Sequence, residues 1–330
     1  MRRDFRLLEQ LVIKYGVDGV KSAINRLNED DSALAQLAAD QKNADQNKNT
    51  KFTTEQRRQQ LIDFFKTKSY HDYIATLNSM AKDDKFRVLI DAAFGSDNDS
   101  ALGTISLNES KESRYTKSLI PTQSEIDITK SLVWGLKGGE KETNVQIALS
   151  NIDRIFSGDA VKLGKGEGMP IVTFGSYIID GHHRWSQVYC FNPSAKMACV
   201  DFEGDLSPLE MLKATQGCIA AIRKNVPSSI VEGSNMFNAS EDAIRKYIDK
   251  NILDEVVERI KKYKSNLKDK NDVVNYITSN CMLMKSNNMP MKGNNETAPN
   301  RGDMPQTDTV NSNVLKDKLE NGVIEIPGKK

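Results

Sequence analysis

The chain has 330 residues, enough for two domains or for one domain with appended segments. Its 46 lysines and arginines nearly balance 45 aspartates and glutamates, so the net charge of +1 excludes a globally basic protein and any basic surface must be local. The four cysteines lack Cys-x-x-Cys spacing and predict neither a zinc site nor a disulfide framework. The sequence has no long apolar stretch, so neither a signal peptide nor a membrane span is predicted. We therefore expect reduced thiols, a cytoplasmic location and no membrane partner.

Residues 1–95 predict a helical N-terminal region with a polar linker near 40–54. Apolar residues recur at helical spacing, for example at Leu7, Leu11 and Tyr15, and again around Tyr73. These stripes indicate core packing, with a docking face for a protein partner as the alternative. His71 is interpreted as a surface or capping residue.

Residues 101–225 predict a domain of mixed helices and strands. Helices are expected around 132–136, 145–155 and 185–189, and strands over 169–179 and 196–202. Ser207 and Glu210 have the spacing of a capping box, with Pro208 at the first helical position. The glycines of 164–168 lack the Gly-Lys-Ser/Thr ending of a P-loop and predict a flexible loop that is able to close over a ligand.

Residues 226–284 predict a helical C-terminal region, and residues 285–330 predict a mostly disordered tail. The helical region carries a cluster of basic residues, which either faces phosphate or forms a solvated helix surface. The cluster comprises Arg259, Lys261, Lys262, Lys264, Lys268 and Lys270.

The segment Asp180-Gly181-His182-His183-Arg184 concentrates the chemistry of the chain, because two of its three histidines are adjacent there. It lies between a strand-like run and a helix-like run. Glycine permits close backbone approach, and the first N–H groups of the helix point at whatever occupies the turn. The guanidinium fork suits phosphate. The two imidazoles should point to different sides, so that one faces the ligand. The segment predicts a phosphate-handling site, with a helix-capping role for Asp180 as the alternative.

Together with residues 118–128 and 196–202, this turn resembles the ParB/sulfiredoxin superfamily, whose members carry Gly-x-x-Arg or Asp-Gly-His-His-Arg motifs at such a position. The resemblance covers roughly residues 117–203. It implies an α+β fold, a ParB/sulfiredoxin-like mixed sheet with flanking helices, to which this chain adds helical N- and C-terminal extensions.

Free serine kinases of this fold carry Asp-Gly-His-His-Arg itself, with a catalytic glutamate in the early segment where this chain has Glu125. From its place at the end of the strand, Asp180 is expected to hold Mg²⁺ or to orient a catalytic histidine, His182 or His183. The kinase resemblance implies Glu125 as the base. It also implies that the phosphate groups lie against Gly181, His182, His183 and Arg184.

The chain departs from two other branches of the superfamily. Sulfiredoxins have their nucleophilic cysteine where His182 stands, so sulfinic-acid reduction is not expected. ParB proteins carry Gly-Glu-Arg-Arg and bind CTP as DNA clamps, whereas His182 and His183 replace the glutamate and the first arginine here. Stand-alone proteins with this domain are often described as ParB-like nucleases of phages, and such an origin would mean the host cytoplasm.

The leading hypothesis is a protein that binds a nucleoside triphosphate, ATP or CTP with Mg²⁺, and transfers or hydrolyses a phosphoryl group at residues 180–184. The first alternative is a DNA-binding nuclease or clamp, which requires a basic face joining Arg184 to the cluster at 259–270. The second alternative is a phage structural or interaction protein that retains the fold.

Overall fold

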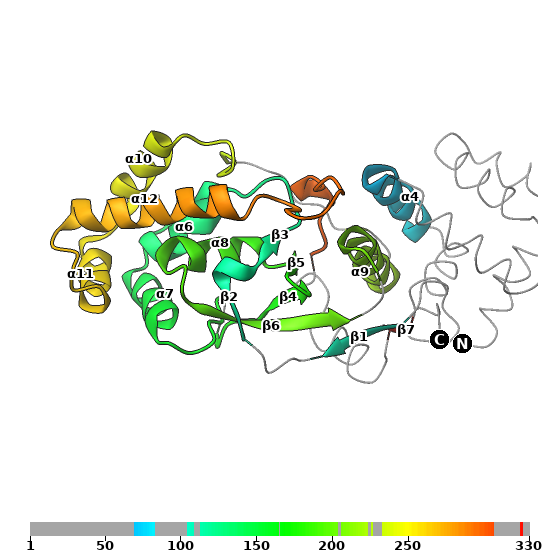
Figure 1. Ribbon diagram of the computed structural model, residues 1–330, viewed down its shortest axis with the longest axis horizontal. Coiled ribbons are helices and arrows are strands. Elements are labelled where there is room, and N and C mark those ends of the chain that lie inside the picture. Colours follow the sequence, from blue (N-terminus) through cyan, green and yellow to red (C-terminus); the bar gives the residue numbers. More distant parts are fainter. Residues whose placement is uncertain are drawn as a thin grey trace, which may run out of the picture. The chain divides into compact units, whose positions relative to one another are not determined.

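The computed structural model describes residues 69–82, 104–108, 113–164, 166–203, 206–223, 226, 233–306 and 324–325 (Figure 1). The chain divides into two compact units. One comprises residues 1–107, 203–228 and 305–330, and the other comprises residues 108–202 and 229–304. The second unit, called the core unit below, contains the segment 180–184.

The core unit contains a mixed sheet in the order β3-β5-β4-β6, with β2 on the other side of β6. The β3–β5 and β4–β6 pairs are parallel, and the β4–β5 and β2–β6 pairs are antiparallel. The predicted α+β class is therefore confirmed. The strands are β2 (Ser113–Tyr115), β3 (Ile120–Pro121), β4 (Ile171–Phe174), β5 (Tyr177–Asp180) and β6 (Lys196–Glu203).

The apolar run 169–179 forms a hairpin, so the prediction of one strand there was wrong. β4 and β5 pair antiparallel, with Phe174 opposite Tyr177. Gly175 has a φ of 57°, a backbone conformation that glycine adopts without steric cost and that allows a tight reversal between the strands. The reversal brings Asp180 opposite Val172 and the segment 180–184 beside the start of β4.

Six helices of the core unit pack around one apolar core. In Figure 1, α12 lies along α8, and the packing of α12 on α8 and of α11 on α7 is extensive. Ile244, Val256 and Ile277 from the C-terminal helices share the core with Trp185. The predicted boundary at 225/226 therefore does not separate two cores. The helices are α6 (Ile128–Leu136), α7 (Val145–Phe156), α8 (His182–Phe191), α10 (Glu241–Asn251), α11 (Asp254–Tyr263) and α12 (Lys270–Asn287).

Polar side chains cap four of these helices, whereas α8 and α11 begin without a side-chain cap. Asp127 caps α6, Asn144 caps α7, Ser240 caps α10 and Asp269 caps α12, each accepting a backbone N–H bond three residues ahead. The cap on α6 matters most for the site, because the backbone N–H of Asp127 also donates a hydrogen bond to His183.

The segment 288–304 packs against the core unit, contrary to the predicted disorder from residue 285. The buried side chain of Asn288 donates to the carbonyl oxygens of Lys117 and Leu119. Met291 is also buried, and so is Arg301 in the short 3₁₀ helix η2 (Arg301–Asp303). Buried methionines and the two hydrogen bonds from Asn288 offset an ordering cost that the polar composition led us to overestimate, although Oδ1 of Asn288 has no partner among the described residues.

In the other unit, α4 (Tyr70–Lys82) packs on α9 (Pro208–Arg223), and the Tyr73 hydroxyl donates to the carbonyl oxygen of Lys213 at 2.7 Å. The Ser207–Glu210 capping box is confirmed, since each backbone N–H donates to the other side chain. β1 (Thr104–Asn108) pairs antiparallel with β7 (Ile324–Glu325). His71 is exposed in the first turn of α4. The other helices predicted before residue 95 lie outside the described residues.

None of the helices in the described ranges is long and apolar enough to cross a membrane.

Candidate functional site

Gly181 lies between β5 and α8 and has a backbone conformation that glycine adopts more easily than other residues. Its φ is 97° and its ψ is 21°, in the left-handed region. A Cβ atom at this position would lie 2.6 Å from Cγ2 of Ile171 and 3.1 Å from an Arg184 nitrogen. The close approach lets the first turn of α8 sit directly against β4.

His182 points into the protein and not toward solvent. Its imidazole is 4% exposed, and Nε2 accepts a 3.0 Å hydrogen bond from the backbone N–H of Thr122. Burial lowers the pKa of His182 from 6.5 to about 3. An Nε2 atom that accepts from an N–H carries no proton, so His182 is a neutral imidazole protonated on Nδ1.

His183 binds the backbone at Asp127, five residues after Thr122, and also faces a cavity. Its Nε2 accepts a 3.2 Å hydrogen bond from the backbone N–H of Asp127. Burial lowers the pKa of His183 well below 6.5, and the positive charges of Arg301 and Lys130 lower it further. The two adjacent imidazoles therefore fasten residues 122–127 to the start of α8, and His183 alone lines the cavity.

Asp127 and Arg301 lie behind His183 as a buried pair. The Asp127 side chain is 2% exposed, caps α6 and approaches Nη1 of Arg301 at 3.9 Å. Sequence reasoning missed both residues as parts of the site. No sequence pattern linked the two residues, which are far apart in the chain; an aspartate before an apolar helix is a usual cap, but the sequence analysis did not identify Asp127 as one.

Arg184 joins α8 to the glycine-rich loop before β4. Its Nη1 donates to the carbonyl oxygens of Met169 and Pro170 at 3.0 Å and 2.7 Å. Arg154 on α7 holds the same loop, since its Nη2 donates to the carbonyl oxygen of Gly166 at 2.8 Å. Arg154 thus binds the middle of the loop predicted at 164–168, Arg184 binds the two residues that follow it, and each guanidinium keeps further N–H donors.

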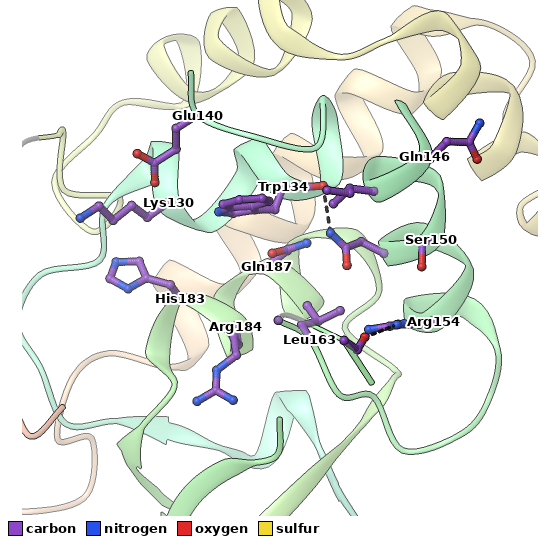
Figure 2. A pocket seen from close by; sticks show the side chains of 14 residues that line it. Lys130, Trp134, Glu140, Gln146, Ser150, Arg154, Leu163, His183, Arg184 and Gln187 are labelled. Carbon is purple, nitrogen blue, oxygen red and sulfur yellow. Dashed lines mark hydrogen bonds between the residues drawn. The ribbon is translucent and has the colours of Figure 1, made fainter. Parts of the chain in front are cut away.

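A pocket of about 720 Å³ opens between α6, α7, α8 and this loop (Figure 2). Its size lies within the range usual for small-molecule sites. Each helix contributes side chains spaced three or four residues apart, which places them on one helix face. The lining residues are Lys130, Trp134, Glu140, Gln146, Ile147, Ser150, Asn151, Arg154, Leu163, Gly164, Gly166, His183, Arg184 and Gln187.

The charge of the pocket lining is positive. Lys130, Arg154 and Arg184 contribute three cations, and Glu140 contributes one carboxylate. Within the described ranges, none of the three cations forms an ion pair with a carboxylate. The first N–H groups of α8 add partial positive charge at the same place. The pocket therefore favours an anion.

Four of the predicted site residues do not line the pocket: Glu125, Asp180, Gly181 and His182. Asp180 ends β5, and its Oδ1 accepts from the N–H of Gly181 at 2.7 Å. Glu125 lies in the loop 122–127, where its Oε2 accepts from the N–H of Arg301 at 3.4 Å. His182 is likewise turned away from the pocket toward Thr122. Of the predicted residues, His183 and Arg184 are brought together at the pocket wall, with Gly181 forming the turn that positions them.

Within the same described segments, no group of three or more histidine, cysteine, aspartate or glutamate side chains is arranged to hold a metal ion. Comparison with known proteins adds no relative: no family model, no curated protein and no solved structure matches this chain.

Proposed function

We propose that this chain is a ParB/sulfiredoxin-like protein that binds a small phosphate ester, with a nucleoside triphosphate as the leading candidate, in the pocket beside Arg184. The observation that carries the proposal is the set of three cations, Lys130, Arg154 and Arg184, that line one pocket without a carboxylate partner among the described residues. Guanidinium groups that retain free N–H donors bind phosphate oxygens through two parallel hydrogen bonds.

The start of α8 supports the same ligand class. The backbone N–H groups of the first helical turn have no partner within the helix, and they attract anions. Gly181 lets this end of the helix lie close against β4, because a Cβ atom there would meet the Ile171 side chain. His183 is uncharged, so it contributes a hydrogen bond and not a positive charge.

Phosphoryl transfer or hydrolysis remains the expected use of such a ligand, but the residues that would carry it need revision. Glu125 and Asp180 were the predicted base and Mg²⁺ ligand, and neither lines the pocket. Their carboxylates accept backbone hydrogen bonds instead. The pocket residues do not fit a protein-held Mg²⁺ ion, since Glu140 is the only carboxylate in the described lining. We therefore derive no catalytic step and propose binding as the primary function.

The DNA-binding alternative has weaker support. It needs a basic face that continues to the cluster at 259–270. Arg259 pairs with Asp153, Lys261 with Glu258, and Lys270 with Asp249. Half of that cluster is therefore neutralised by neighbouring carboxylates, which reduces the attraction for a phosphate backbone.

The test is binding of ATP, CTP, GTP and inorganic tripolyphosphate, measured by calorimetry and thermal shift with and without Mg²⁺. The wild type should bind at least one of these anions, and Arg184→Gln should weaken binding about tenfold or more, because it removes one charge-assisted contact. Glutamine keeps an N–H donor for the carbonyl oxygens of Met169 and Pro170, so the loop should stay in place.

Arg245→Gln is the matched control. Arg245 is exposed and donates to Asn271, away from the pocket. Its replacement removes the same charge and should leave binding unchanged. If no phosphate compound binds to the wild type, or if both variants weaken binding equally, the pocket is not an anion site and the proposal is wrong.

A further inference from the structure

We infer that the inner end of the pocket recognises a nucleobase, with the ring stacked on Trp134 and its edge hydrogen-bonded to the amide of Gln187. The inference rests on the proposed binding of phosphate at Arg184 and specifies what the rest of that ligand is. Figure 2 shows both side chains facing the cavity from neighbouring helices, α6 and α8.

Gln187 carries an unsatisfied polar group inside the pocket wall. The side chain is 4% exposed, and its Nε2 has no hydrogen-bond partner among the described residues. A buried polar group without a partner is destabilising, so native proteins rarely retain one without a reason. Nε2 is itself buried, so the amide reaches a ligand by turning toward the cavity, where it offers N–H or, after rotation about its last bond, C=O. It therefore matches the donor and acceptor edge of a base.

Trp134 supplies a flat surface next to that amide. Its side chain is 40% exposed although its helix neighbours Leu132, Val133 and Leu136 are fully or almost fully buried. Its backbone carbonyl oxygen accepts from Nδ2 of Asn151 at 3.1 Å, which fixes this turn of α6 against α7. An exposed indole held on a rigid helix inside a pocket is a stacking platform for an aromatic ring.

The order of residues along α8 separates the two ends of the ligand. Arg184 lies in the first turn of the helix, and Gln187 lies one turn further in, about 4.5 Å along the axis. Phosphate groups at the helix start and a base beside Gln187 therefore follow from the helix geometry. A pocket of about 720 Å³ has room for both parts.

The experiment compares the affinities of ATP, CTP and tripolyphosphate for the wild type, Gln187→Met and Trp134→Leu by calorimetry. Methionine keeps the volume of glutamine without its amide, and leucine keeps apolar character without the ring. The wild type should bind at least one nucleotide about tenfold or more tightly than tripolyphosphate. Each variant should lose most of that preference and keep its affinity for tripolyphosphate. Tyr115→Leu, which removes an aromatic ring exposed outside the pocket, should keep the preference.

The outcomes distinguish this inference from the proposed function. If tripolyphosphate binds and no nucleotide binds more tightly, the base site does not exist while the phosphate site stands. A preference that survives in both variants also overturns the inference. If neither nucleotides nor tripolyphosphate bind, the proposed function fails, and the inference fails with it.

Discussion

Replacing His182 by glutamine should flatten the dependence of protein stability on pH. In the unfolded chain the imidazole takes up a proton as the pH falls through 6.5, whereas burial lowers the pKa in the folded protein to about 3. The stability that His182 contributes is therefore fully present above 6.5 and is lost progressively as the pH falls toward 3. Between about pH 7 and about pH 5 the loss amounts to about 2 kcal/mol for this one group.

Glutamine suits the test because its side-chain oxygen accepts the hydrogen bond from the N–H of Thr122 and does not titrate. Chemical denaturation at several pH values between about 5 and 7 gives the free energy of unfolding for the wild type and for His182→Gln. The difference between the two proteins should shrink by about 2 kcal/mol as the pH is lowered. Groups away from His182 contribute equally in both proteins and cancel, whereas His183 keeps the burial that dominates its lowered pKa and loses only the smaller effect of His182.

His71→Gln is the matched control, because His71 is exposed in the first turn of α4. It should leave the slope unchanged. If His182→Gln has the same pH slope as the wild type, His182 is not held neutral in the folded protein. The account of two imidazoles fastening residues 122–127 would then be refuted.

Two further changes test the geometry around the turn. Gly181→Ala should lower the free energy of unfolding by about 2 kcal/mol or more, because alanine is strained in the left-handed region and its Cβ would also clash with Ile171 of β4. Gly158 has a φ of 89° but open space around it, so Gly158→Ala should lower the free energy of unfolding by only about 1 kcal/mol in the same denaturation assay. Arg301→Met should destabilise the protein by about 3 kcal/mol, because it leaves the buried Asp127 carboxylate without this partner. The same change should raise the pKa of His183 toward its usual value, which an NMR titration of the imidazole measures. An unchanged pKa would show that the charge of Arg301 does not act on His183.

The sequence predicted several helices of the core unit and the start of one helix of the other unit, because local patterns encode them. Apolar spacing located α6 and α7, and the Ser207–Glu210 box gave the start of α9. The hairpin at Gly175 was missed because the run on both sides of it is almost continuously apolar, and a single glycine and serine were the only turn signal. The C-terminal helices were separated from the domain because periodicity says which face is buried but not against what.

The site was predicted in its position but not in its composition. The turn 180–184 does border the pocket, and the divergence of the two histidines was expected from helix geometry. The partners that complete the pocket come from α6 and α7, and helical spacing marked Trp134 and Arg154 only as ordinary members of amphipathic helices. Tertiary packing, which a single sequence does not reveal, selects them.

The contact between the loop 122–127 and Arg301 has a consequence for how the protein is made. The backbone N–H of Arg301 meets the Glu125 side chain across a sequence separation of 176 residues. Chains leave the ribosome at roughly 5–20 residues per second, so the loop waits on the order of ten seconds or more for this partner. Until Arg301 has been synthesised, its interactions with His183 and with the loop 122–127 are missing, and the sheet and α8 must hold the turn 180–184 without them. The contact of Arg301 with the loop is therefore made late in synthesis, and a chain shortened to residue 285 would keep every pocket-lining residue yet lack this contact behind His183.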